Sequence, residues 1–227
     1  MIRWSLIDTT TVPDDGGELR LMQRGTEFSI MSGAIELMNS RLSGSEKALA
    51  TLACERLKDR PGAHLLIGGF GMGFTLRAAL ENLGPEAKVT VCELVPAVIA
   101  WARGPMAHIS GDCLRDPRLT VHEGDVGVLI RSADARYDAI LLDVDNGPEG
   151  LSRKANDRLY DHDGLMAARR ALRPGGVLAV WSSAPNASFT QRLRRAGYAV
   201  EEVRVRATGA GRGARHMIWV ATAPTRS

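Results

Sequence analysis

Leu65-Leu66-Ile67-Gly68-Gly69-Phe70-Gly71-Met72-Gly73-Phe74-Thr75 is the segment from which the architecture of this 227-residue chain can be worked out. An apolar strand runs into spaced glycines, and the residues after them begin a helix. Glycine allows the backbone to turn sharply and a flat ligand to approach it closely, while free amide groups at a helix start add polarity. The same pattern also occurs in turns with a purely structural role, so the neighbouring segments have to decide between the two interpretations.

The chain on either side of the glycines alternates between apolar strands and helices. Near-continuous Leu, Ile and Val strands that alternate with helices are typical of a parallel sheet covered on both faces. The strands are expected at His64–Ile67, Val89–Cys92, Leu119–His122, Ala139–Leu142 and Val177–Trp181. After a first helix with Ser45 as its N-cap, the helices are expected near Thr75–Asn82, Pro96–Arg103, Val126–Arg131, Asn156–Leu172 and Ala187–Ala196.

Both ends of the chain depart from this alternation. Tyr198–Arg206 and His216–Thr222 are two strands with no helix between them, which predicts a terminal antiparallel hairpin. Short alternating runs separated by X-Gly turns predict an antiparallel meander between Glu18 and Met38, whereas residues 1–17 carry little pattern. We predict an α/β, Rossmann-like fold with a mostly parallel seven-stranded sheet, a C-terminal antiparallel hairpin and a small N-terminal β-meander. The meander would occupy residues 1–44 and the Rossmann-like domain residues 45–227.

Composition and charge restrict the class of protein. The hydrophobic fraction of 44% and the charged fraction of 24% are those of a globular domain. No apolar run approaches the ~20 residues that span a bilayer, and the chain reaches Asp8 too soon to build a signal peptide, so we expect a cytoplasmic protein with no membrane partner. Three dispersed cysteines and the isolated His122 and His216 predict neither disulfides nor a metal site. A net charge of +3, with arginines scattered over several faces, does not favour nucleic acid as a partner.

Acidic residues follow the next two strands of the predicted sheet. Glu93 ends the second strand, where a carboxylate is placed to accept both hydroxyl hydrogens of a ribose. Asp125 follows the third strand, where it can accept from an adenine amino group, although a helix N-cap would have the same residue type. The carboxyl ends of parallel strands share one edge of the sheet, so these acids and the glycine turn together predict a site for an adenosine-containing cofactor. Its predicted contacts are Gly69, Phe70, Gly71, Met72, Gly73, Glu93, Leu94, Gly124, Asp125 and Asp143.

The fourth strand runs into a further polar stretch, residues 143–148. Two carboxylates and an amide in it are placed to face the same crevice. Adjacent acids raise one another's pKa and can hold or deprotonate an amine or hydroxyl nucleophile, although acids in a cap and turn give the same pattern. We predict that Asp143 and Asp145 are catalytic and that Asn146 orients the substrate.

These motifs together resemble the spermidine synthase family and its methyltransferase-like relatives, which share the class I S-adenosylmethionine-dependent methyltransferase fold. The resemblance covers about residues 25–185. Residues 69–77 are similar to the family's GGGDGGxLR loop, Glu93 matches its ribose-binding acid, and residues 116–125 are similar to its DPR…GD segment, whose last acid contacts adenine. Asp143, with Gly147-Pro148 after it, resembles the catalytic DxxDPxGP stretch. The resemblance implies S-adenosylmethionine or its decarboxylated form as cofactor, a small-molecule acceptor and a homodimer.

The chain departs from the family on the side that would bind the aminopropyl group and the amine. Met72 stands where spermidine synthases carry an aspartate, the DxxDPxGP stretch is two residues shorter, and the Gln, Tyr and His of the DGxxQ…YHE segment are absent. A neutral Met72 lacks the charge to pair with the terminal ammonium of decarboxylated S-adenosylmethionine. We therefore predict an S-adenosylmethionine-dependent enzyme that moves a methyl group to a small acceptor such as an amine. The alternatives are a polyamine aminopropyltransferase, a nucleic-acid methyltransferase and a non-catalytic S-adenosylmethionine-binding protein.

Three residues outside these motifs are further candidates for substrate contact. Arg41 can pair with a substrate carboxylate, Glu46 can accept from a cationic substrate, and Tyr160 can cover the pocket. Each also has a structural interpretation, namely a salt-bridged arginine, a surface acid and a tyrosine in helix packing.

Overall fold

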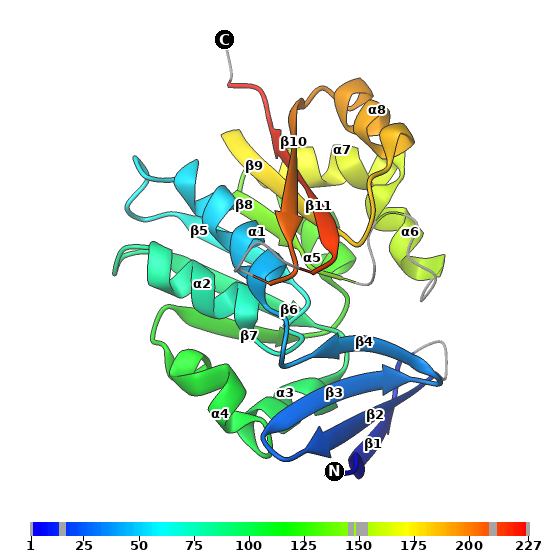
Figure 1. Cartoon of the computed structure of the whole chain (residues 1–227). Coiled ribbons are helices and arrows are strands. Elements are labelled where there is room, and N and C mark those ends of the chain that lie inside the picture. Colours follow the sequence, from blue (N-terminus) through cyan, green and yellow to red (C-terminus); the bar gives the residue numbers. More distant parts are fainter. Residues whose placement is uncertain (1, 14–16, 145–147, 149–153, 209–212, 226–227) are drawn as a thin grey trace.

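One large and one small sheet organise the part of the chain that the structure describes (Figure 1). The structure is a computed structural model and describes residues 2–13, 17–144, 148, 154–208 and 213–225. The large sheet has the order β10-β11-β9-β8-β5-β6-β7 and is parallel except at β11 and β10, which confirms the predicted fold. Its strands are β5 (His64–Gly68), β6 (Lys88–Glu93), β7 (Leu119–Glu123), β8 (Tyr137–Leu142), β9 (Leu172–Ser182), β10 (Ala199–Arg206) and β11 (Arg215–Thr222).

The central strands are buried on both faces because helices cover both sides of the sheet. Along β5, Leu65 and Ile67 belong to one core and Leu66 to the other, since successive side chains of a strand point to opposite faces. The first core contains residues of α1 (Gly44–Glu55), α2 (Phe74–Asn82) and α3 (Pro96–Arg103). The second contains residues of α5 (Val126–Ser132), α6 (Lys154–Tyr160), α7 (His162–Ala171) and α8 (Ala187–Arg195).

The parallel register aligns the carboxyl ends of neighbouring strands at one edge of the sheet. Gly68 pairs with Cys92 of β6 and with Leu142 of β8, and Glu93 pairs with Glu123 of β7. The backbone amide of Asp143 donates to the carbonyl of Gly68 at 3.0 Å, so the loops after β5 and β8 run side by side. The polar residues that follow these strands in sequence are therefore neighbours in space.

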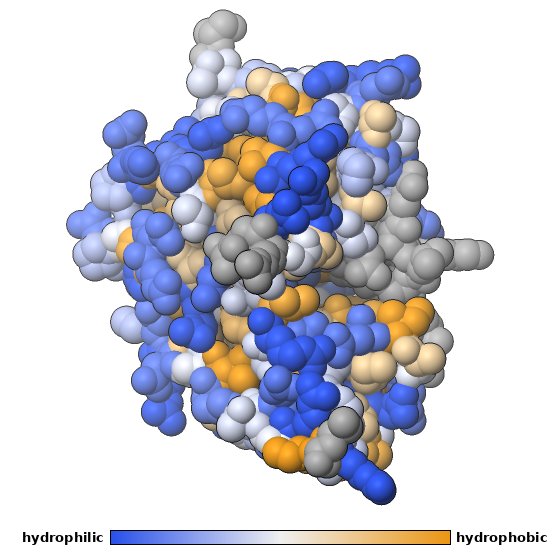
Figure 2. Space-filling model, in the orientation of Figure 1, coloured by the Kyte–Doolittle hydropathy of each residue, from blue (hydrophilic) through white to orange (hydrophobic). Residues whose placement is uncertain are grey.

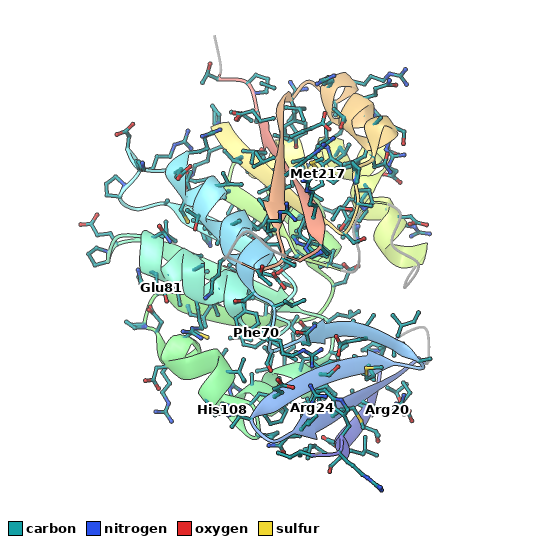
Figure 3. All side chains as sticks on the ribbon, in the orientation of Figure 1. Arg20, Arg24, Phe70, Glu81, His108 and Met217 are labelled. Carbon is teal, nitrogen blue, oxygen red and sulfur yellow. The ribbon has the colours of Figure 1, made fainter. Side chains whose placement is uncertain are left out.

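The small sheet packs against this edge. Its strands β1 (Ser5–Thr11), β2 (Glu18–Arg24), β3 (Glu27–Ser32) and β4 (Ile35–Asn39) form an antiparallel meander in that order. Leu21, Phe28 and Ile30 are fully buried in the same core cluster as β5 and α3. The small sheet also contacts α4 (Ala107–Ser110), where the Nε2 atom of His108 lies 3.3 Å from the carbonyl oxygen of Thr26 (Figure 3). The division into residues 1–44 and 45–227 stays a prediction.

Some local expectations are wrong. Residues 5–11 form the edge strand β1, whose side chains are nearly all exposed, so no alternation of apolar and polar residues marks it in the sequence. The single helix expected over residues 156–172 is two, because Asp161 caps α7 by accepting from the Gly164 amide at 2.7 Å. Ser43, not Ser45, holds the N-cap position of α1. A short helix, α4, and a 3-10 turn, η1 (Gly111–Arg115), were not expected.

On the face shown in Figure 2, the hydrophobic residues of the described part of the chain gather in small separate groups among hydrophilic ones. Scattered apolar side chains are normal on the surface of a globular protein. Within the described residues, no helix combines the length and the hydropathy needed to cross a membrane.

Candidate functional site

The glycine turn after β5 is tight and holds backbone conformations that favour glycine. Gly69, Gly71 and Gly73 have φ angles of +87°, +55° and +82°, in the left-handed region that side chains disfavour. The Gly69 amide donates to the carbonyl of Cys92 at 2.8 Å, and Gly73 is the N-cap residue of α2. A Cβ atom on Gly69 would lie 2.4 Å from the carbonyl oxygen of Asp143. The turn therefore needs glycine at position 69 to run this close to the loop after β8.

Glu93 at the end of β6 is buried and holds the glycine turn in place. Its two carboxylate oxygens accept from the amides of Phe70 and Val95, at 2.8 and 2.9 Å. Burial raises the pKa of this carboxyl group, and the backbone amides around it oppose the rise. Glu93 also lines a cavity at the strand ends, which is described below.

Asp125 serves as a helix cap. Its Oδ1 atom accepts from the Gly127 amide at 2.7 Å at the start of α5, as the structural interpretation expects. Asp125 also lines a cavity, so the cap and the predicted contact to adenine are compatible. The preceding residue, Gly124, donates its amide hydrogen to the Glu93 carbonyl at 2.8 Å, which places the two strand ends together.

A cavity of about 190 Å³ lies at these strand ends, between the two sheets, and is named here the strand-tip cavity. It brings together seven of the residues predicted from sequence to bind the cofactor: Gly69, Gly71, Glu93, Leu94, Gly124, Asp125 and Asp143. Leu19 of β2 and Ile30 of β3 close its other side. The small sheet thus supplies an apolar wall opposite the polar strand ends, as a flat nucleoside base requires.

A second cavity, of about 110 Å³, adjoins the first and is named here the acidic cavity. Its lining includes the carboxyl groups of Glu46 and Asp143 among apolar side chains such as Met72, Phe74 and Trp181. The two cavities share four lining residues, Leu37, Met38, Gly71 and Asp143. Phe70 and Met72 of the glycine turn line only the acidic cavity, and Phe70 appears in Figure 3 between the two sheets.

Asp143 stands at the junction of the two cavities and is half-buried. The Thr75 hydroxyl group donates to its Oδ2 atom at 2.6 Å. Burial raises the pKa of Asp143 to about 7, the nearby Glu46 carboxyl adds to the rise, and the Thr75 bond opposes it. Burial also raises the pKa of Glu46, against the hydrogen bond from Ser45. A carboxyl group with a pKa near neutral can both take up and release a proton at physiological pH.

The other predicted site residues do not line either cavity in the described structure. Asp145 and Asn146 lie outside the described residues. The Arg41 guanidinium pairs with the Glu36 carboxylate at 3.1 Å on the small sheet. Tyr160 is buried, packs edge-on against Phe189, and its hydroxyl donates to the Val144 carbonyl at 3.3 Å. Their roles in substrate binding stay predictions, and these contacts agree with the structural interpretations.

Four residues of the site were not singled out from sequence for a role in it. Thr75, Trp181, His216 and Ser45 come from α2, β9, β11 and α1 and meet near the two carboxyl groups. The only local signal was for Thr75, a hydroxyl residue two positions after the last glycine of the turn. The other three occupy ordinary strand and helix positions, and nothing in their local pattern shows that they meet.

Comparisons with known proteins show which family this chain is similar to. Residues 46–196 match a family described as the spermine/spermidine synthase domain. Polyamine aminopropyltransferase 1 of Streptomyces coelicolor is 32% identical over 153 residues, which are 64% of this chain and 28% of that protein. The polyamine aminopropyltransferase of Korarchaeum cryptofilum is 31% identical over 140 residues, 61% of this chain and 41% of that protein. The matches thus span less than half the length of these two relatives.

The fold also has a counterpart among solved structures. A crystal structure of spermidine synthase in complex with the transition state analogue AdoDATO superposes with a TM-score of 0.74 at 18% identity. The superposition covers 97% of this chain and 73% of that chain. At this identity the likeness shows a shared fold.

These findings contradict the prediction of methyl transfer. Both relatives above are named polyamine aminopropyltransferases, which was the alternative considered from sequence. The prediction rests on departures from the family pattern on the aminopropyl and amine side, and its electrostatic argument rests on the loss of a carboxylate at Met72. In the structure Met72 lines the same cavity as Glu46 and Asp143, so other elements supply negative charge to that wall.

Proposed function

The chain belongs to the spermine/spermidine synthase domain family, and we propose that it is a polyamine aminopropyltransferase. It would move the aminopropyl group of decarboxylated S-adenosylmethionine to a primary amine. The observation that carries the proposal is the meeting of two cavities at Asp143, one suited to an adenosine group and one walled by carboxyl groups.

The strand-tip cavity fits the adenosine part of the donor. Glu93 can accept from the ribose hydroxyls and Asp125 from the adenine amino group, and the backbone of Gly69 and Gly71 lines the same cavity. The apolar side chains of Leu19 and Ile30 can cover the base. When bound, the donor supplies a carbon atom next to a sulfonium, which is open to in-line attack.

The acidic cavity fits the acceptor. Glu46 can bind a cationic nitrogen of a polyamine, and Asp143 can hold the reacting nitrogen at the junction with the donor cavity. Asp143 accepts the proton that the nitrogen loses as the new C–N bond replaces the C–S bond, whose electron pair stays on sulfur. The pKa of Asp143 near 7 suits this proton transfer because the group is substantially ionised at neutral pH.

The purified protein is expected to convert decarboxylated S-adenosylmethionine and putrescine into equal amounts of an aminopropylated amine and methylthioadenosine. Mass spectrometry of both products checks this result. With S-adenosylmethionine as the only donor, no product is expected. A methylated amine from that donor, without aminopropyl product from the other, would contradict the proposal.

Glu93→Gln is expected to weaken the binding of methylthioadenosine by about 10- to 100-fold, because a carboxylate that accepts from hydroxyl groups becomes a neutral amide. Calorimetric titration measures the effect. Glu123→Gln is the matched control, since Glu123 pairs with Glu93 in the sheet, is exposed and lines neither cavity. Equal affinities in the two variants would remove Glu93 from the donor site.

A further inference from the structure

A chain of hydrogen bonds leads from β11 to the acidic cavity. The Nδ1 atom of His216 lies 2.9 Å from the Ser45 hydroxyl oxygen, which lies 2.7 Å from Oε2 of Glu46. The His216 ring is half-buried and stands edge-on to Trp181, with ring centroids 4.8 Å apart, and Trp181 and Glu46 both line the cavity. α1 packs against β9 and β11, so Ser45 is fully buried between His216 and the cavity wall.

The direction of these hydrogen bonds follows from the groups involved. A carboxylate only accepts, so the single hydroxyl hydrogen of Ser45 is donated to Glu46. The Ser45 oxygen then accepts from His216, which must carry its hydrogen on Nδ1. Burial lowers the pKa of His216, so the ring is a neutral donor near pH 7. Each donor in such a chain polarises the next, and both bonds stabilise negative charge on Glu46.

Other charged groups around His216 do not replace this chain. Lys47 on α1 favours the ionised form of Glu46, whereas Asp143 beyond the cavity is a second acid. His216 pairs with Val205 of β10, so Arg204 and Arg206 alternate to the opposite face of the sheet. Arg215 precedes His216 on β11 and alternates in the same way. The Ser45 hydroxyl is the hydrogen-bond donor through which His216 reaches the carboxyl pair.

We propose that His216 is a positioning residue that acts through Ser45 to keep Glu46 ionised and turned to the acidic cavity. Two acids in one site tend to share a proton, and the better-solvated one keeps its charge. With Glu46 held charged, Glu46 binds the cationic nitrogen of the acceptor and Asp143 is left to exchange the proton. That the bound cation is the acceptor amine rests on the proposed function, whereas the effect of His216 on Glu46 does not.

The test compares His216→Leu and Ser45→Ala with His216→Asn, whose amide N–H can replace the donor at Nδ1. His216→Leu and Ser45→Ala are expected to raise the KM for putrescine by about tenfold or more, with little change in kcat or in the KM for the donor. His216→Asn is expected to restore the KM to near the wild-type value. His64→Leu is the matched control, because His64 is also half-buried and bonded to a hydroxyl group, that of Thr90, at the other end of the sheet.

A readout without turnover separates this proposal from the proposed function. Carbon NMR of the labelled Glu46 carboxyl group is expected to show titration at higher pH in His216→Leu than in the wild type, His216→Asn or His64→Leu. An unchanged Glu46 titration in His216→Leu overturns the positioning role, even if the enzyme transfers aminopropyl groups. A shifted titration in a protein that transfers no aminopropyl group supports the role and rejects the proposed function.

Discussion

Asp143→Asn is expected to lower the rate of aminopropyl transfer by about 100- to 10,000-fold, because the variant has no carboxylate to hold and deprotonate the attacking amine. Product formation followed by mass spectrometry measures the loss. Binding of methylthioadenosine is expected to change little, since the proposed adenosine contacts are to Glu93 and Asp125. Asp134→Asn, at an exposed position away from both cavities, is the control and should keep full activity.

The same substitution is expected to stabilise the protein at alkaline pH. The pKa of Asp143 in the folded protein is about 7, above the value near 3.9 of an aspartate in an unfolded chain. The folded state thus holds this proton more tightly, and the stabilisation is complete below about pH 4 and is lost as the pH rises through 7. Asparagine carries no charge at any pH, so the variant avoids this loss.

Urea unfolding at two pH values checks the sign of this effect. At pH 8.5 the free energy of unfolding of Asp143→Asn should exceed that of the wild type by roughly 2–4 kcal/mol, and at pH 5 the difference should be much smaller. A variant that keeps its activity would exclude Asp143 as the base. A variant that is less stable than the wild type at pH 8.5 would show that burial of this carboxyl carries no such penalty.

Gly69→Ala is the second substitution with a large expected effect, on stability and donor binding together. The new Cβ atom would lie 2.4 Å from the Asp143 carbonyl oxygen, a backbone atom that cannot move away easily, on a residue with a φ of +87°. The left-handed conformation alone costs about 1–2 kcal/mol, and the clash should bring the loss in unfolding free energy to about 3 kcal/mol or more. Because the displaced backbone borders both cavities, methylthioadenosine binding should become undetectable by calorimetry.

Gly33→Ala separates the cost of the left-handed backbone conformation from the cost of the steric clash. Gly33 also has a positive φ, of +56°, but a Cβ atom there would have no neighbour within 4 Å. It should therefore lose only about 1 kcal/mol and keep its affinity for methylthioadenosine. If Gly69→Ala and Gly33→Ala lost similar amounts of unfolding free energy, the loop after β8 would have moved to accommodate the added methyl group.

The sequence was informative wherever one physical rule links residue order to position in space. Parallel apolar strands end at one edge of the sheet, so the sequence alone predicts that Glu93, Asp125 and Asp143 lie together. The spaced glycines before α2 marked the tight turn in the same way. No such rule predicts the edge strand β1, because exposed side chains need not alternate in polarity.

The choice of reaction failed for a related reason. Met72 is one side chain in a wall built by several elements, and the charge of a cavity is a sum over all of them. Glu46 reaches that wall from α1, which the sequence places far from the strand ends. Glu46 was a candidate for substrate contact from sequence, but only the tertiary structure shows that it lines one cavity with Met72 and Asp143.

By itself, then, the sequence determined the strands of the large sheet, the turn at Gly69 and the acids at the strand ends, because each depends on local periodicity and on the geometry of parallel strands. The tertiary structure alone decided that Asp143 faces Glu46 and that His216 reaches Glu46 through Ser45. Those contacts join α1, β8 and β11 across the sheet. Their distances and burial, which set the pKa of Asp143, arise from packing and leave no pattern in the order of residues.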